Sequence, residues 1–140
     1  MTVATALVTG NDPLPHLAEQ AIRQALARAG LTHANGVLLF LTPEFARHAQ
    51  QTITAVARAA QCTQVAGGIA SGVLTETGWA LDRPAVAVMV LGRGLSLGHP
   101  EAGKPPLLSY VGGSFPPDWS DSGTRFGGVF SGSFAASAGI

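Results

Sequence analysis

Charged residues are scarce in this chain of 140 residues. They make up 11% of the sequence, whereas 46% of the residues are hydrophobic. Soluble domains usually carry about 25% charged residues. So little charge leaves part of the surface apolar, which favours cover by a neighbouring domain or by a second copy in a homo-oligomer. Eight basic residues balance eight acidic ones, so no basic stripe is present and nucleic-acid binding is not expected.

Cysteine and long apolar runs are scarce as well. The single cysteine, Cys62, excludes a disulfide within the chain. The longest apolar run, residues 85–91, is too short to span a bilayer. Residues 1–5 contain no charged segment ahead of an apolar stretch, so we expect no signal peptide. These features predict a cytoplasmic protein that does not enter a membrane.

The first part of the chain alternates strands and helices. Residues 4–9 have the pattern of a strand, and Asp12 followed by Pro13 is typical of a helix start, with Gly30 as its end. Residues 36–41 are continuously apolar, as expected for a strand buried on both faces.

The same arrangement then repeats. Thr42 is predicted to cap a second helix that opens at Pro43, and residues 62–66 are predicted to form a short strand. This order predicts that the first three strands are parallel and are joined by two crossover helices.

The later part of the chain favours antiparallel strands. Residues 73–81 have the pattern of a hairpin, and residues 85–91 that of a central strand. Three valines of that strand point to one face, and the small residues of the other face would let a helix lie close. Residues 92–121 are rich in glycine and proline, and we expect a long loop there with one strand at 107–111. The predicted fold is a single α/β domain, residues 1–140, with a mixed sheet.

A glycine-rich hexapeptide pattern occurs twice, as Gly67–Gly72 and again as Gly127–Gly132. Paired glycines permit sharp turns and close approach of the backbone to a ligand, and the serine of each copy adds a hydroxyl group. Two interpretations stay open. Either both copies are loops that line one ligand pocket, or they are tight turns that bind nothing.

The first copy, together with residues 67–75, 84–91, 36–41 and 124–131, resembles the N-terminal FIST domain. This family is a sensory module found beside histidine kinases, chemotaxis receptors and cyclase output domains, and also in an F-box protein. The resemblance implies an intracellular sensory domain in signal transduction that binds small ligands such as amino acids. It implies as partners a C-terminal FIST domain or a signalling output domain. The alternative is a protein-interaction module without a small-molecule ligand.

The expected ligand site combines the glycine motifs with the ends of the predicted parallel strands. Free amides and threonine hydroxyls at two helix starts suit a small anionic ligand, and an arginine could hold a carboxylate with two hydrogen bonds. The predicted ligand-binding residues are Gly67, Gly68, Ser71, Arg125, Gly127, Gly128, Ser131, Thr42 and Thr9.

Catalytic motifs are incomplete. Residues 94–98 match a nucleophile elbow, but Pro100 interrupts the required helix and no histidine follows His99. Residues 98–104 match a phosphate-binding loop only up to Lys104, after which two prolines replace the required hydroxyl residue. Cys62 follows a predicted helix C-terminus, which disfavours a thiolate. The histidines lie too far apart for a metal site. We expect no enzyme activity, no metal and no cofactor.

Overall fold

The main sheet of the protein has five strands and is mixed, and this places the chain in the α/β class as predicted. The computed structural model describes residues 2–98, 107–119, 124–130 and 135–138. The strand order is β1-β6-β2-β3-β9, and within this sheet only β2 and β3 pair in parallel. The strand bounds are Thr2–Thr9 for β1, Gly36–Leu41 for β2, Val65–Ile69 for β3, Ala85–Gly92 for β6 and Ala135–Ala138 for β9.

The three strands predicted to be parallel do run in the same direction, and β2 pairs with β3 as expected, but β1 does not pair with β2. Strands β1 and β2 are each antiparallel to β6, so they point the same way, but β6 lies between them. Strand β6 is apolar on both faces, whereas β1 carries exposed and half-buried residues, so β6 takes the interior position and β1 the edge. The third strand begins at Val65 rather than Cys62, because the chain leaves the preceding helix through Gln61 at φ 49°.

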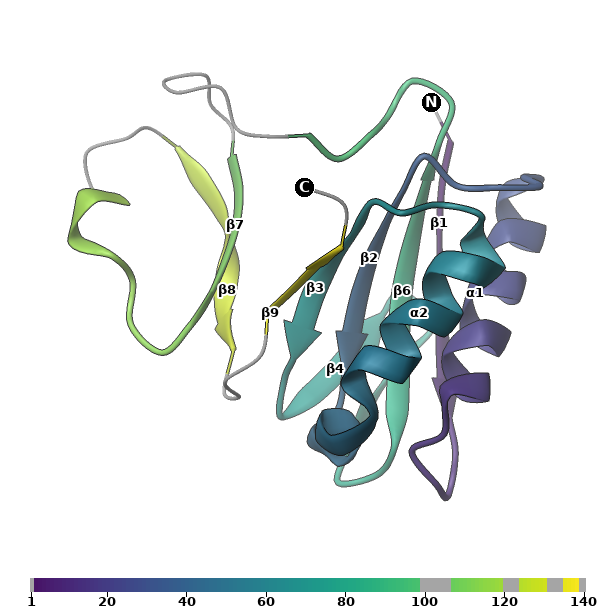
Figure 1. Ribbon diagram of the computed structural model, residues 1–140, viewed down its shortest axis with the longest axis horizontal. Coiled ribbons are helices and arrows are strands. Elements are labelled where there is room, and N and C mark those ends of the chain that lie inside the picture. The colour runs from purple at the N-terminus through teal and green to yellow at the C-terminus, as the bar shows by residue number, and fades with distance from the viewer. Residues whose placement is uncertain (1, 99–106, 120–123, 131–134, 139–140) are drawn as a thin grey trace.

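Two helical segments follow β1 and β2. Helix α1 spans Pro15–Ala29, two residues later than predicted, because Leu14 occupies the N-cap and no side chain caps the helix. Gly30 ends α1 at φ 64°, as the sequence predicts. After β2, a 3-10 helix, η1 (Pro43–His48), leads into α2 (Ala49–Ala60). Both helices lie in front of the sheet (Figure 1). No helix in the part of the chain that the structure describes is long and apolar enough to cross a membrane.

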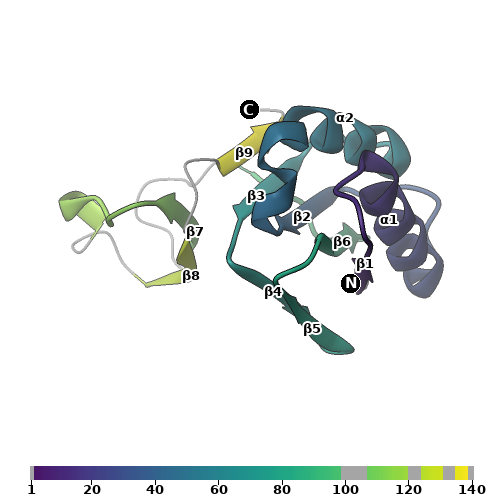
Figure 2. The same cartoon turned by 90° about the horizontal axis from the view of Figure 1, so that it is seen from below.

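The two faces of the sheet are covered differently. The valines at 86, 88 and 90 of β6 pack in one core cluster with α1 and α2. On the other face, Ala85 and Ala87 pack against Val73 and Ala80 of a hairpin made of β4 (Gly72–Thr75) and β5 (Gly78–Leu81). Figure 2 shows this hairpin on the side of the sheet opposite the helices. The prediction of a helix against the small-residue face is therefore wrong, since the hairpin packs there, although the hairpin itself is confirmed.

Polar contacts join the hairpin to β1. The Thr5 hydroxyl donates a hydrogen bond to the Glu76 carboxylate in the hairpin turn. Arg28 of α1 donates to the Thr5 carbonyl over 2.9 Å, and its guanidinium lies 3.9 Å from Glu76. The Thr5 hydrogen bond is the main cause that lowers the pKa of Glu76. These contacts tie α1, β1 and the hairpin together at one edge of the sheet.

A second, two-stranded sheet stands beside β9 (Figure 1). Strand β7 (Leu107–Gly112) pairs in parallel with β8 (Arg125–Phe130), and a short 3-10 helix, η2 (Pro117–Trp119), lies in the connection between them. Ring contacts attach this sheet to the main one. Phe40 of β2 lies 5.3 Å from Tyr110 and 6.1 Å from Phe130, measured between ring centroids. The predicted strand at 107–111 is thereby confirmed.

Candidate ligand-binding site

A cavity of about 750 Å³ lies at the end of the main sheet where β1 and β2 finish. Three segments line it. The connection from β1 to α1 contributes Gly10, Asn11 and Pro13, η1 contributes Glu44, Arg47 and His48, and the turn from β5 to β6 contributes Asp82, Arg83 and Pro84. The site therefore lies where strands end, which is the usual place for ligands in α/β sheets.

The position of β6 between β1 and β2 brings these segments together. Because β6 runs antiparallel to both neighbours, its first residue, Ala85, lies opposite Thr9 at the end of β1. The Gly10 amide donates to the Pro84 carbonyl over 2.9 Å, and the Thr42 amide donates to the Ala85 carbonyl over 3.1 Å. These hydrogen bonds hold together the backbone segments that carry the lining side chains.

Ionisable side chains are concentrated at this cavity. Glu44, Arg47, Asp82 and Arg83 are all exposed, and His48 is half-buried. Within the described residues, neither arginine has a carboxylate within the 4.0 Å of an ion pair. Among the described residues, no ion pair involves the cationic or the anionic side chains of this cavity. Groups of both signs suit a zwitterion, because the arginines can bind a carboxylate and the acids an ammonium group.

The two threonines predicted to bind the ligand are not among the residues that line this cavity, although Thr9 directly precedes Gly10 and Thr42 directly precedes η1. Thr42 is fully buried, and its hydroxyl accepts a hydrogen bond from the Ala85 amide over 2.9 Å and donates to the Ala85 carbonyl over 3.4 Å. That hydroxyl serves the junction of β2 with β6 and caps no helix. Thr9 is exposed at the end of β1, next to Gly10.

The glycine pair of the first motif lies inside β3, so the prediction of a loop or turn at these two glycines is wrong, and the motif then passes through a bend to Gly72 at the start of β4. Gly67 has φ 155°, and a Cβ atom there would lie 1.7 Å from the Leu39 carbonyl oxygen. A Cβ atom on Gly68 would lie 2.7 Å from the ring of Phe130. The glycine pair thus makes room for the neighbouring strand and for a ring of the second motif. Ser71 is exposed in the bend that follows β3.

The second motif has the same arrangement in β8. Gly127 has φ 150°, and a Cβ atom there would lie 1.7 Å from the Ser109 carbonyl oxygen, whereas no atom of the described residues lies within 4 Å of a Cβ atom added to Gly128. Arg125 donates a hydrogen bond to the Ser109 hydroxyl over 3.0 Å, and its guanidinium lies 4.7 Å from the Trp119 ring centroid. This arginine is engaged within the protein. Ser131 lies outside the described residues.

The charged residues of the cavity were missed by the sequence analysis. The sequence feature that could have revealed them is their position next to the predicted strands. Glu44 and Arg47 come just after the strand 36–41, and Asp82 and Arg83 come just before the strand 85–91. If these two strands are antiparallel neighbours, the end of one and the start of the other meet at one edge of the sheet.

Catalytic and metal-binding arrangements find no support. No group of three or more His, Cys, Asp or Glu side chains in the described ranges could hold a metal ion. Cys62 is half-buried, and its sulfur accepts a hydrogen bond from the Gln64 amide over 3.4 Å. Residues 93 and 94 form a turn and residues 95–98 have no regular secondary structure, so none of the described residues just after Ser96 begins the helix that a nucleophile elbow needs.

No family model matches the chain, and no curated protein matches it with significance.

Proposed function

We propose that this chain is a sensory domain that binds a small zwitterionic metabolite, such as an amino acid, in the cavity between β1, η1 and the β5–β6 turn. The observation that carries the proposal is the concentration of charge. In a chain with 11% charged residues, two arginines, two acids and a histidine line one cavity of about 750 Å³. A volume of this size is in the range of small-molecule sites.

The proposed binding mode follows from the two signs of charge. Arg47 and Arg83 take the carboxylate, and Glu44 and Asp82 take the ammonium group. Backbone hydrogen bonds hold the wall segments together, so the ordering needed on binding falls on the exposed charged side chains. The resemblance to FIST domains supports the same class of ligand. In this proposal an adjacent FIST or output domain inside the cell reads the bound state.

A protein-interaction module is the second candidate, and one observation favours it. Leu74 and Trp79 lie directly opposite each other in the β4–β5 hairpin, and they are 76% and 71% exposed. Tryptophan is among the residues most enriched at the energetic centres of protein interfaces. The hairpin could dock a partner without any small molecule.

Melting temperatures measured with a panel of free amino acids, their methyl esters and their N-acetyl derivatives test the proposal. A ligand present at about a hundred times its Kd stabilises the fold by roughly 2.7 kcal/mol. We expect at least one free amino acid to raise the melting temperature, and both blocked forms to lose the effect, because each lacks one of the two charges. A blocked form that works as well as the free amino acid would contradict zwitterion recognition.

A further inference from the structure

Strand β1 lies at one edge of the main sheet. Among the described residues it has a single strand partner, β6, so the backbone groups on its other side have no strand to bond to there. Its eight residues, Thr2–Thr9, include no charged residue, no proline and no glycine. A long uncharged edge strand of this kind readily pairs with a strand of another chain, and proteins usually block such edges.

The register shows which backbone groups of β1 point away from the sheet. The Gly10 amide donates to the Pro84 carbonyl over 2.9 Å, so Gly10 and every second residue before it bond to β6. The residues between them turn their amide and carbonyl groups outward. These residues are Val3, Thr5, Leu7 and Thr9. A strand added to this edge would have to bond to their backbone groups.

Side chains from two other elements meet at the centre of this outward row. Arg28, in the last turn of α1, donates to the outward Thr5 carbonyl over 2.9 Å. The Thr5 hydroxyl donates to the Glu76 carboxylate in the hairpin turn, and that carboxylate lies 3.9 Å from the Arg28 guanidinium. Because α1 and the hairpin cover opposite faces of the sheet, Arg28 and Glu76 meet across the edge of β1.

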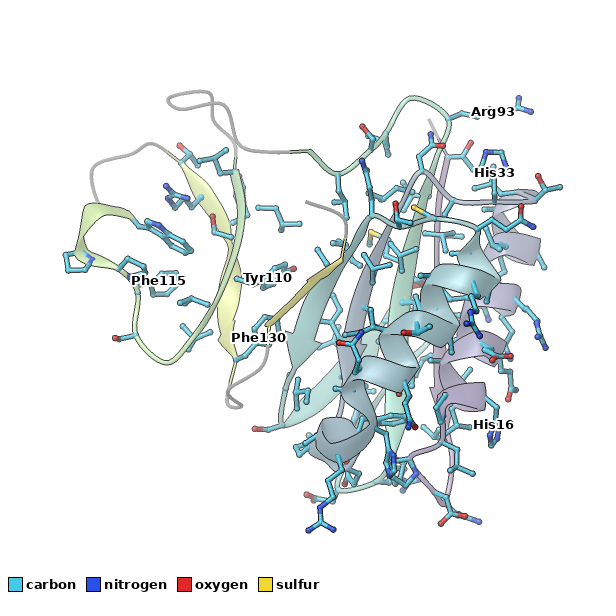
Figure 3. All side chains as sticks on the ribbon, in the orientation of Figure 1. His16, His33, Arg93, Tyr110, Phe115 and Phe130 are labelled. Atoms are coloured by element: carbon cyan, nitrogen blue, oxygen red, sulfur yellow. The ribbon has the colours of Figure 1, made fainter. Side chains whose placement is uncertain are left out.

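The direction of α1 brings Arg28 to this place. In Figure 3, His16 in the first turn of α1 and His33 just after the helix lie toward opposite ends of the sheet, and β1 begins at the end where His33 lies. The last turn of α1 therefore lies beside the first half of β1. Arg23, one turn earlier, instead pairs with Glu19 of the same helix over 3.1 Å.

We propose that Arg28 blocks strand addition at β1, and that without it β1 pairs with β1 of a second copy of the protein. An incoming strand must donate an amide to the Thr5 carbonyl, and it would have to displace the guanidinium that already donates there. A second copy fits this edge, because two antiparallel β1 strands oppose each other about a two-fold axis with no like charges in contact.

The contact acts on association rather than on the stability of the fold. Arg28 and Glu76 are both exposed, and an exposed ion pair contributes little to the free energy of unfolding. Neither residue lines the charged cavity, so the proposal does not depend on the function proposed above.

Hydrogen exchange of the β1 amides, measured by NMR on the ¹⁵N-labelled protein, tests this proposal. In Arg28→Met at high protein concentration, we expect the outward amides of Thr5 and Leu7 to exchange at least about tenfold more slowly than in the parent, because they become bonded to a second copy. The protection should increase with protein concentration. Arg23→Met removes the same charge from the same helix, and its β1 amides should exchange like those of the parent. These amides report on β1 alone, so association through the hairpin does not affect the result.

A second variant blocks the edge by another means. Val3 is 43% exposed and its amide points outward, so Val3→Pro removes no hydrogen bond to β6 and cannot donate to an added strand. In the double variant Arg28→Met/Val3→Pro we expect Thr5 and Leu7 to exchange as in the parent.

The result that overturns the proposal is equal exchange of these two amides in Arg28→Met and the parent, or equal protection in Arg23→Met. If Arg28→Met precipitates, recovery of dissolved protein in the double variant supports the proposal, and continued precipitation contradicts it.

Discussion

Replacing Gly67 by alanine tests whether the glycine motif is needed for strand pairing. The new Cβ atom would lie 1.7 Å from the Leu39 carbonyl oxygen and 2.6 Å from the Leu39 carbonyl carbon. Both atoms belong to the backbone of β2, so no side-chain rotation relieves the clash. Either β3 moves away from β2 or the substituted residue takes a different φ, and each alternative disrupts the parallel pairing of these two strands.

The cost follows from two contributions. A non-glycine residue forced into a sparsely populated backbone conformation costs about 1–3 kcal/mol. A buried backbone hydrogen bond lost between β2 and β3 costs about 1–3 kcal/mol more. The sum, about 2–6 kcal/mol, is a large part of the stability of a typical domain. For a chain of this size it corresponds to a fall in melting temperature on the order of 10–20 °C.

Urea unfolding followed by circular dichroism measures this cost as a free energy of unfolding. Gly127→Ala should also destabilise, because its Cβ atom would meet the Ser109 carbonyl oxygen at 1.7 Å. Gly128→Ala is the matched control, since no atom of the described residues lies within 4 Å of its Cβ atom, and we expect a change within about 1 kcal/mol. If Gly67→Ala were as stable as Gly128→Ala, the assignment of Gly67 to strand pairing would be refuted.

Three further predictions concern other parts of the fold. Thr42→Val should lower the free energy of unfolding by about 1–3 kcal/mol in urea titrations, because it leaves the buried Ala85 amide unpaired, whereas Thr9→Val at an exposed position should change it little. Absorbance at 295 nm should show Tyr110, the single tyrosine, titrating above pH 10.0, because burial raises its pKa. Because the folded state raises this pKa, the contribution of Tyr110 to the free energy of unfolding is complete below pH 10 and is lost as the pH rises through the raised pKa. A titration midpoint of the folded protein at or below that of the chain unfolded in guanidinium would refute this. Because Trp79 is 71% exposed, Trp79→Ser should change the free energy of unfolding by less than about 0.5 kcal/mol and should reduce self-association measured by light scattering. Unchanged self-association would mean that the hairpin does not mediate contacts between copies of the protein.

Local patterns in the sequence predicted elements well. The apolar run at 36–41, the hairpin around Thr77 and Gly78, and the helix end at Gly30 are all present. Each depends on a few adjacent residues, whose periodicity or φ preference acts locally. The start of α1 was less accurate, because Asp12 accepts a backbone hydrogen bond from Leu14 instead of capping the helix with its side chain, whereas η1 begins at Pro43 as predicted.

Strand pairing and the charged cavity were not predictable in the same way. Whether Ala85–Gly92 pairs with β1, β2 or both depends on contacts between residues far apart in sequence. Glu44 and Asp82 have no evident relation until β6 is placed beside β2. The glycine pairs were assigned to loops because the sequence does not reveal that a neighbouring strand's carbonyl group occupies the space at Gly67.

Calorimetric titration of the protein with the amino acid that most raises its melting temperature tests the central claim most directly. The parent protein, the double variant Arg47→Gln/Arg83→Gln and the control Arg93→Gln, an exposed arginine outside the cavity, should be compared. We expect the double variant to bind at least about tenfold more weakly, a loss of about 1.4 kcal/mol, and the control to bind like the parent. Equal affinity of all three proteins, or no heat of binding from any amino acid of the panel, would contradict the proposed site.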